Sequence, residues 1–256
     1  MKKLTLGYLY PEYMNIYGDT GNIIALINRG KSREIEIEVQ SISKNSELKN
    51  NTIDIYFFGG GQDQQQVFVS QDIQRLAPII TDDINRGAVA LTICGGYQLF
   101  GKFYRPFEGD DLKGIDIFPS ETHASNTRMI NNLVVKTNQK LDEAIQNIYT
   151  TQWEIPHTLV GFENHSGQTT LTPATQTLGQ TLYGYGNNES KQYEGCWVKN
   201  AFGTYMHGSL LPKNPHFTDY LLHQATKYRY QDDTKFEPLP DTLALQAHNH
   251  IVKKYA

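Results

Sequence analysis

In the N-terminal part of the chain, apolar residues gather in short runs that are separated by polar, helix-compatible segments. Residues 4–10, 53–58 and 88–93 form such runs, and the run at 53–58 is dense enough to predict a central strand buried on both faces. Residues 35–39 alternate apolar with charged side chains, which is typical of a strand with one exposed face. Strands that alternate with helices predict a mostly parallel, doubly wound α/β sheet.

Two helices are predicted between these strands. The first spans about 19–33, with Asp19 or Thr20 as its N-terminal cap. The second spans about 63–86, and we expect an interruption near Pro78, because proline removes a backbone donor and clashes with the preceding turn.

The C-terminal part has fewer regular patterns. Strands are predicted at 133–136 and 158–163, and the polar residues 164–167 either form a turn or belong to a site. Residues 195–199 and 201–206 predict two adjacent strands, as in a hairpin.

Two helices are expected to end the chain. Asn214 caps the first of them, and Pro215 follows at a position where proline is favoured. Asp241 begins the last helix, whose His248 and His250 are expected to face solvent. We expect residues 1–256 to form a single domain that includes these helices.

The composition limits the possible functions. The chain has 256 residues, with 23 Lys and Arg against 27 Asp and Glu, and no basic block that would favour nucleic acid or an anionic membrane. No apolar run approaches the roughly 20 residues of a membrane-spanning helix. Two cysteines suit a reducing compartment, and no Cys or His cluster has zinc-ligand spacing. We therefore expect a soluble cytoplasmic protein with no metal site.

One stretch, 88–100, combines a buried strand, a cysteine, two glycines and a short helix. Such a unit exposes a nucleophile at its turn, and Gly95 and Gly96 would let a substrate approach the backbone. The helix N-terminus would stabilise a Cys94 thiolate. A buried structural cysteine is the competing interpretation, and the glycine pair favours a functional role for Cys94.

A second glycine cluster, 59–61, follows the predicted central strand. Because the carboxyl ends of parallel strands meet at one edge, this cluster and Cys94 are expected to face the same crevice. The cluster is either a flexible turn or a source of backbone donors. In the second case the N–H of Gly95, together with one from Gly60 or Gly61, would bind a substrate oxyanion.

A nucleophilic cysteine also needs a base. His207 is preferred because it follows a predicted strand and precedes a glycine. His123, His157 and His165 remain competitors.

The spacing G-x-x-x-x-G-K at 96–102 matches a phosphate-binding loop, but Phe103 stands where a magnesium-binding Ser or Thr is required. The spacer is also bulky and helix-forming, so no nucleotide site is expected here.

Several motifs together resemble those of the class I glutamine amidotransferases. They are TICGGYQ at 92–98 and TYMHG at 204–208, in the form seen in the cobyric-acid-synthase-like branch. Three further stretches, at 18–26, 58–61 and 160–165, are similar to the glutaminase subunits of lipid II isoglutaminyl synthases. The resemblance extends from about Leu4 to the last helix.

The resemblance implies a flavodoxin-like glutaminase domain. It implies that Cys94 is the nucleophile, that His207 is the base and that Arg128 binds the carboxylate of glutamine, although the residues alone do not distinguish Arg128 from a surface arginine. Ammonia would pass to a Mur-ligase-like partner, MurT, in a heterodimer. That partner would use ATP and magnesium to amidate D-glutamate in lipid II, so no cofactor is expected on this chain.

Two positions depart from the wider superfamily. Thr92 stands where many members have glycine, and Ser209 stands where a glutamate usually orients the catalytic histidine. The resemblance therefore implies a Cys–His dyad, and the group that orients His207 is not identified.

Two other functions are weighed against this one. A cysteine hydrolase of the DJ-1/PfpI type would have a similar sheet, but it usually carries a histidine directly after the cysteine, where Gly95 stands here. A flavodoxin-like binding module with an inert cysteine is the non-enzymatic alternative.

Overall fold

The computed structural model describes residues 1–256 and contains two six-stranded sheets. The first sheet has the order β11-β12-β4-β3-β1-β2. Its strands are β1 (Lys2–Leu9), β2 (Ile35–Ile42), β3 (Ile55–Phe58), β4 (Val89–Ile93), β11 (Cys196–Val198) and β12 (Ala201–Thr204). All neighbours are parallel except the β11–β12 hairpin. The predicted doubly wound, mostly parallel sheet and the predicted hairpin are therefore confirmed.

The strand order reverses beside β1. The chain passes from β1 to β2 on one side and then returns to β3 on the other side of β1. Ligands bind at such a switch point, beyond the carboxyl ends of the strands. The loops that follow β1, β3, β4 and β12 end at this edge, which is where the candidate site residues lie.

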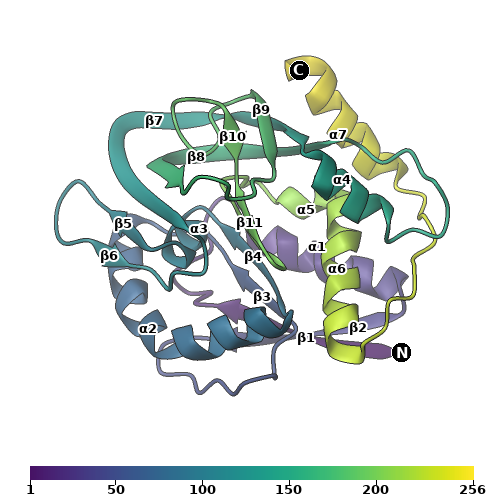
Figure 1. Ribbon diagram of the computed structural model, residues 1–256, viewed down its shortest axis with the longest axis horizontal. Coiled ribbons are helices and arrows are strands. Elements are labelled where there is room, and N and C mark those ends of the chain that lie inside the picture. Colours follow the sequence, from purple (N-terminus) through teal and green to yellow (C-terminus); the bar gives the residue numbers. More distant parts are fainter.

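The second sheet was predicted only in fragments. Its order is β10-β9-β7-β5-β6, with β8 paired to β7, and most of it lies in the upper half of Figure 1. Its strands are β5 (Phe103–Arg105), β6 (Leu112–Lys113), β7 (Ser120–Thr137), β8 (Thr158–Leu171), β9 (Gly179–Tyr183) and β10 (Tyr193–Glu194). The long β7 and β8 are rich in Ser, Thr and Asn, so that only their apolar ends were visible as strand patterns.

Of the two interpretations of residues 164–167, the turn is wrong, because β8 continues through these residues and pairs with β7, and they line the cavity described below. The two sheets pack on a common core, which includes Phe57 of β3 and Leu133 of β7. They also meet at the site itself, where Phe162 of β8 and His207 after β12 exchange two backbone hydrogen bonds.

Seven helices complete the fold: α1 (Thr20–Ser32), α2 (Asp63–Arg86), α3 (Gly95–Phe100), α4 (Gln139–Gln146), α5 (Leu210–Lys213), α6 (Pro215–Tyr230) and α7 (Thr242–Tyr255). The expected interruption of α2 is wrong, because the helix runs through Pro78. Buried Leu76 and Ile80 pack into the core on either side of the proline and hold both halves in one helix.

The predicted cap residues do not cap with their side chains. Asp19, Asn214 and Asp241 precede α1, α6 and α7, but none accepts a hydrogen bond from the first turn. The Asn214 amide instead pairs with the backbone N–H and C=O of Val160, which joins α6 to β8. Pro215 occupies the first turn of α6, as predicted.

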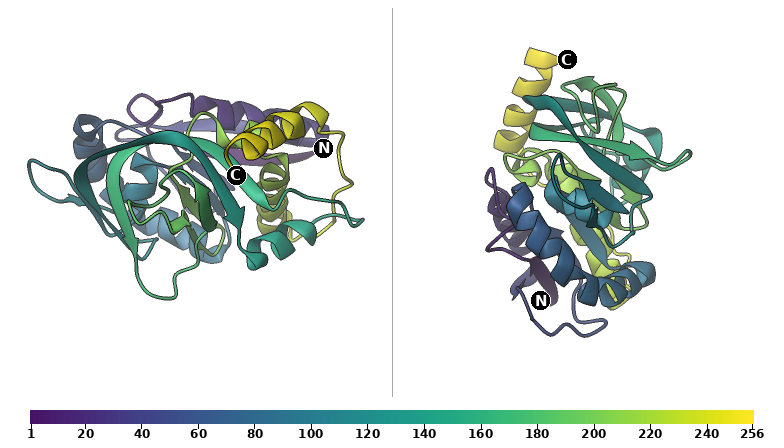
Figure 2. Two further views of the ribbon diagram at one scale, coloured as in Figure 1. Left: turned by 90° about the horizontal axis from the view of Figure 1, so that it is seen from above. Right: turned by 90° about the vertical axis from the view of Figure 1, so that its left-hand side faces the viewer.

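The last helix, α7, packs beside β7 and β8, as the yellow helix in Figure 2 shows. The expectation of a solvated His248 is wrong, because this side chain is fully buried between α7 and the sheet. Its ring nitrogens bond to the Thr158 hydroxyl and the Lys213 carbonyl, so burial costs no lost hydrogen bond. No helix is both long enough and apolar enough to cross a membrane.

Candidate active site

Cys94 lies at the turn between β4 and α3, as the sequence predicted. Its backbone has φ 51° and ψ −104°, a strained conformation for a residue with a side chain. The turn is fixed from both sides: the Cys94 N–H donates to Thr204 O at 2.8 Å, and Gln98 N–H donates to Cys94 O at 2.9 Å. These two hydrogen bonds hold the strained backbone in place, with the thiol on the wall of a cavity.

The glycines allow a close approach of backbones around this turn. A Cβ on Gly96 would lie 2.4 Å from Phe58 O, and one on Gly60 would lie 2.5 Å from Cε1 of His207. Gly61 lines the cavity. Gly95 opens α3, where a backbone N–H has no partner four residues earlier within the helix.

The structure corrects one of the predicted oxyanion donors. The N–H of Gly60 donates to the Asp19 carboxylate at 2.7 Å and is fully engaged there. Gly60 instead leaves room for the His207 ring, and Gly61 is the one of the three predicted glycines that lines the cavity.

His207 is fully buried and follows β12, the parallel neighbour of β4, so it lies at the same edge of the sheet as Cys94. Its Nδ1–H donates to Asp19 Oδ1 at 3.1 Å, across 188 positions of sequence. This bond leaves Nε2 as the nitrogen that can exchange a proton with a neighbour, and Nε2 has no other hydrogen-bond partner.

The electrostatics of His207 favour the charged imidazolium. Burial lowers its pKa, but the negative charges of Cys94 and Asp19 outweigh burial and raise the pKa to about 10. Cys94 has the larger of the two charge effects, although its sulfur makes no well-aligned hydrogen bond to Nε2. The histidine can therefore stabilise a thiolate and deliver a proton.

Asp19 is the partner of His207 that the sequence analysis did not identify. It was interpreted as a helix cap, whereas its carboxylate, fully buried, accepts from both His207 and Gly60. A usable signal was present: Asp19 follows β1, and the rule that placed Cys94 at the carboxyl edge of the sheet also places this loop there. The structure thus places a buried carboxylate against the histidine of the expected Cys–His dyad.

Ser209, two residues after His207, does not contact the imidazole. Its hydroxyl donates to Gly18 O at 2.6 Å, and it packs against Gly21. It therefore supports the loop that holds Asp19 and does not orient the imidazole.

The cavity beside Cys94 measures about 420 Å³, a size that suits a small ligand. Arg128 of β7 lines it and is held by two neighbours: its Nε donates to Asn164 Oδ1 at 2.7 Å, and an Nη donates to the Tyr17 hydroxyl at 3.2 Å. The Tyr17 ring in turn packs edge-on against His207, with centroids 5.0 Å apart. The structure thus brings Arg128 to the same cavity as Cys94.

His165 also lines the cavity, but it is not a base for Cys94. Its Nδ1–H donates to Gly167 O at 3.0 Å, and its ring stacks on Tyr205 with centroids 3.6 Å apart. Burial lowers its pKa to about 3, so it is a neutral wall of the cavity. His123 and His157 do not line the cavity.

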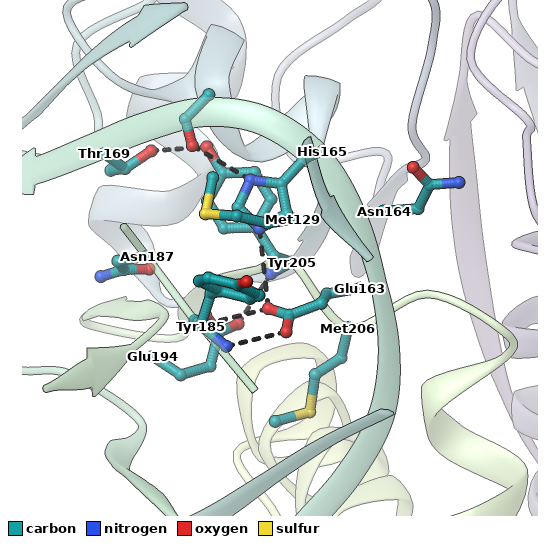
Figure 3. A network of polar contacts seen from close by, with 12 residues as sticks. Met129, Glu163, Asn164, His165, Thr169, Tyr185, Asn187, Glu194, Tyr205 and Met206 are labelled. Atoms are coloured by element: carbon teal, nitrogen blue, oxygen red, sulfur yellow. Dashed lines mark hydrogen bonds and ion pairs between the residues drawn. The ribbon is translucent and has the colours of Figure 1, made fainter. Parts of the chain in front are cut away.

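Behind His165 lies a buried network that contains Glu163 (Figure 3). The alternation of β8 points Glu163 and His165 into this network, and it points Asn164 away from it and toward Arg128. The Glu163 carboxylate accepts from the N–H groups of Tyr185 and Gly186 at 2.7 and 2.9 Å. Burial nevertheless raises its pKa to about 7. This network fixes the strand that supplies one wall of the cavity.

No group of three or more His, Cys, Asp and Glu side chains is arranged to hold a metal ion. A buried thiol within electrostatic reach of an imidazolium, with a carboxylate behind the imidazolium and an arginine at the cavity wall, suits nucleophilic attack on a small amide that carries a carboxylate.

Comparisons with known proteins agree with this chemistry. The profile of the CobB/CobQ-like glutamine amidotransferase domain matches residues 5–215. The GatD subunit of lipid II isoglutaminyl synthase (glutamine-hydrolyzing) from Staphylococcus aureus is 36% identical over 238 residues, which are 93% of this chain and 89% of that protein. Its counterpart from Streptococcus pneumoniae is 35% identical over 243 residues, 94% of this chain and 88% of that protein.

A solved glutamine amidotransferase from Thermotoga maritima has a similar fold. It superposes with a TM-score of 0.55 at 12% identity, covering 97% of this chain and 93% of that one. This likeness shows a shared fold, and the sequence relatives, which cover nearly the whole chain, show the family. The chain is a glutamine amidotransferase of the CobB/CobQ-like family and belongs among the GatD subunits of lipid II isoglutaminyl synthase.

Proposed function

We propose that this chain hydrolyses glutamine through Cys94, His207 and Asp19 and hands the ammonia to a Mur-ligase-like partner, MurT, which amidates D-glutamate in lipid II. The observation that carries the proposal is the buried Asp19–His207 pair, which lies within electrostatic reach of a strained Cys94 at the cavity wall.

The first half of the reaction forms a thioester. The Cys94 thiolate attacks the side-chain carbonyl carbon of glutamine, and the carbonyl oxygen becomes an oxyanion near the N–H groups of Gly61 and Gly95. His207 Nε2 gives its proton to the amide nitrogen, the C–N bond breaks and ammonia leaves. Asp19 keeps the imidazole oriented and stabilises its charge throughout.

The second half returns the enzyme to its starting state. His207, now neutral, takes a proton from water, and the resulting hydroxide attacks the thioester carbon. The C–S bond breaks, glutamate leaves and the thiolate–imidazolium pair is restored. One water is consumed for each glutamate and ammonia released.

The partner follows from the chemistry of amide formation. A carboxylate does not react with ammonia unless it is first activated, here by ATP. The only phosphate-loop spacing in this chain falls on helix α3 and ends before Phe103, so we assign ATP and magnesium to the partner. The names of the relatives, which describe a subunit of a lipid II isoglutaminyl synthase, support a heterodimer. We place it in the cytoplasm and propose that lipid II is reached through the partner.

The test is reconstitution with the Mur-ligase-like subunit, lipid II, ATP and glutamine labelled with ¹⁵N at its amide. We expect ¹⁵N in the amidated lipid II only when both subunits are present, and none with Cys94→Ala. Amidation by this chain alone, or a product without ¹⁵N in the full system, would contradict the proposal.

A further inference from the structure

Two side chains of opposite charge line the cavity besides the catalytic thiol. Asp63 is the first residue of α2, and Arg128 comes from β7. His165, which also lines the cavity, is neutral because burial lowers its pKa to about 3. The cavity therefore offers one negative and one positive group to whatever it holds.

Tyr104 shows that these groups surround one space. Its hydroxyl is buried and donates to Asp63 Oδ1 at 3.3 Å. Burial raises its pKa most strongly, the charges of Asp63 and Cys94 raise it further, and the charge of Arg128 lowers it. Asp63, Cys94 and Arg128 thus lie within electrostatic reach of a single phenol.

Gln66, one turn along α2 from Asp63, adds an unpaired acceptor to the same wall. Only 2% of Gln66 is exposed, and its Nε2 donates to Gly61 O at 3.2 Å. Its Oε1 is buried without a hydrogen-bond partner, and its amide packs against Gly95 beside Cys94. A buried acceptor without a donor is costly, so this oxygen is suited to a ligand N–H.

A structural role for Asp63 is the competing explanation. An acidic residue in the first turn of α2 is favoured by the helix dipole. That role does not account for the unpaired Gln66 oxygen on the same wall. The charge of Asp63 would also repel a substrate carboxylate, so Arg128 is the group on the cavity wall that can bind that carboxylate.

We infer that Asp63 and Gln66 Oε1 bind the α-ammonium group of free glutamine, while Arg128 binds its α-carboxylate. The inference rests on the proposed function and goes beyond it, because it makes Asp63 a specificity-determining residue. The cavity then selects a free α-amino acid and rejects glutamine side chains in peptides, whose α-nitrogen carries no charge.

The experiment compares two substrates in the reconstituted complex: glutamine and 4-carbamoylbutanoate, which keeps the amide and the carboxylate but lacks the ammonium group. Glutamate or glutarate release is measured for wild type, Asp63→Asn and Arg128→Met. Asparagine preserves the size of Asp63 and an acceptor for Tyr104. Arg128→Met is the matched control, because both substrates carry the carboxylate.

We expect Asp63→Asn to lower kcat/KM for glutamine by about 10- to 100-fold, mainly through KM, because a charge-assisted contact is lost. The value for 4-carbamoylbutanoate should stay nearly unchanged, so the preference for glutamine collapses. Arg128→Met should weaken both substrates and keep their ratio.

If Asp63→Asn lowers kcat/KM equally for both substrates, Asp63 serves only to stabilise α2 and the inference is overturned. An unchanged kcat/KM for both substrates would overturn it as well. A wild-type complex that does not hydrolyse glutamine would overturn the proposed function itself and this inference with it.

Discussion

Asp19→Asn isolates the contribution of the buried carboxylate to catalysis. Asparagine keeps the shape and can still accept from Gly60, but its amide N–H would oppose the Nδ1–H of His207. The pair is fully buried at 3.1 Å, so the loss is that of a charge-assisted hydrogen bond, about 1.5–3 kcal/mol. At about 1.4 kcal/mol for each factor of ten, kcat/KM should fall by at least about tenfold.

The same change should move the pH profile. In the wild type, Cys94 and Asp19 raise the pKa of His207 to about 10 against the effect of burial. Without the Asp19 charge this pKa falls, so the imidazolium loses its proton at lower pH. The alkaline limb of kcat/KM, which reports that loss, should therefore shift to lower pH.

The assay is glutamate release across pH 6–10 for wild type, Asp19→Asn and Thr20→Ala. Thr20→Ala is the matched control because it alters the start of α1 without touching His207, and its activity should stay close to wild type. An Asp19→Asn enzyme with wild-type rates and an unshifted alkaline limb would refute the role of Asp19.

Four further predictions follow from the same geometry. Cys94→Ala should abolish glutamine hydrolysis, whereas Cys196→Ala should not, because burial raises the pKa of the Cys196 thiol to about 12 and this thiol lies away from the cavity. Alkylation followed by peptide mapping should label only Cys94, and equal labelling of both cysteines would contradict this. Arg128→Ala should raise KM for glutamine by about tenfold with a smaller change in kcat, because the exposed guanidinium is expected to bind the substrate carboxylate and not the reacting amide. Unchanged kinetics would exclude this role of Arg128. Ser209→Ala should keep kcat within about threefold of wild type, and a collapse of activity would show that its hydroxyl does more than support the loop. Burial raises the pKa of Glu194 to about 7, so between about pH 4.5 and 7 the folded state holds a proton that the unfolded state has lost, and wild type loses stability as the pH rises. In urea unfolding, the free energy of unfolding of Glu194→Gln should therefore rise by about 2 kcal/mol relative to that of wild type from pH 5 to pH 8. A difference that stays constant with pH would refute the shift.

Local patterns predicted the parts of the site that depend on neighbouring residues. The strand before Cys94, the glycines after it and the hairpin that delivers His207 are all written in contiguous sequence. The rule that ligands bind at the carboxyl edge of a parallel sheet was enough to bring Cys94 and the glycines at 59–61 to one edge, and the end of a predicted strand singled out His207.

Contacts between distant segments were not predictable in this way. The partner of His207 comes from 188 positions earlier, and Asp19 carries an equally good local signal as a helix cap. Arg128 was singled out only through the family resemblance, since nothing in its neighbours places it at the cavity wall. The second sheet was predicted only in fragments for a related reason, because the polar parts of β7 and β8 become recognisable as strands only when the two strands pair.

Burial of single polar residues was also invisible in the sequence. His248 has the surroundings of a solvated helix face, and its burial depends on Thr158 and Lys213 from other elements. Pro78 predicted a break that does not occur, because packing of α2 outweighs the local cost of the proline.

The central claim, that Cys94 attacks the amide carbonyl of glutamine, is tested most directly by trapping. The chain, in complex with its partner, is incubated with 6-diazo-5-oxo-L-norleucine, a glutamine analogue that alkylates an attacking nucleophile, and the adduct is located by peptide mass spectrometry. We predict one adduct per chain, on Cys94, which excess glutamine prevents and His207→Ala slows. An adduct on Cys196, or none on a complex that releases glutamate from glutamine, would contradict the account.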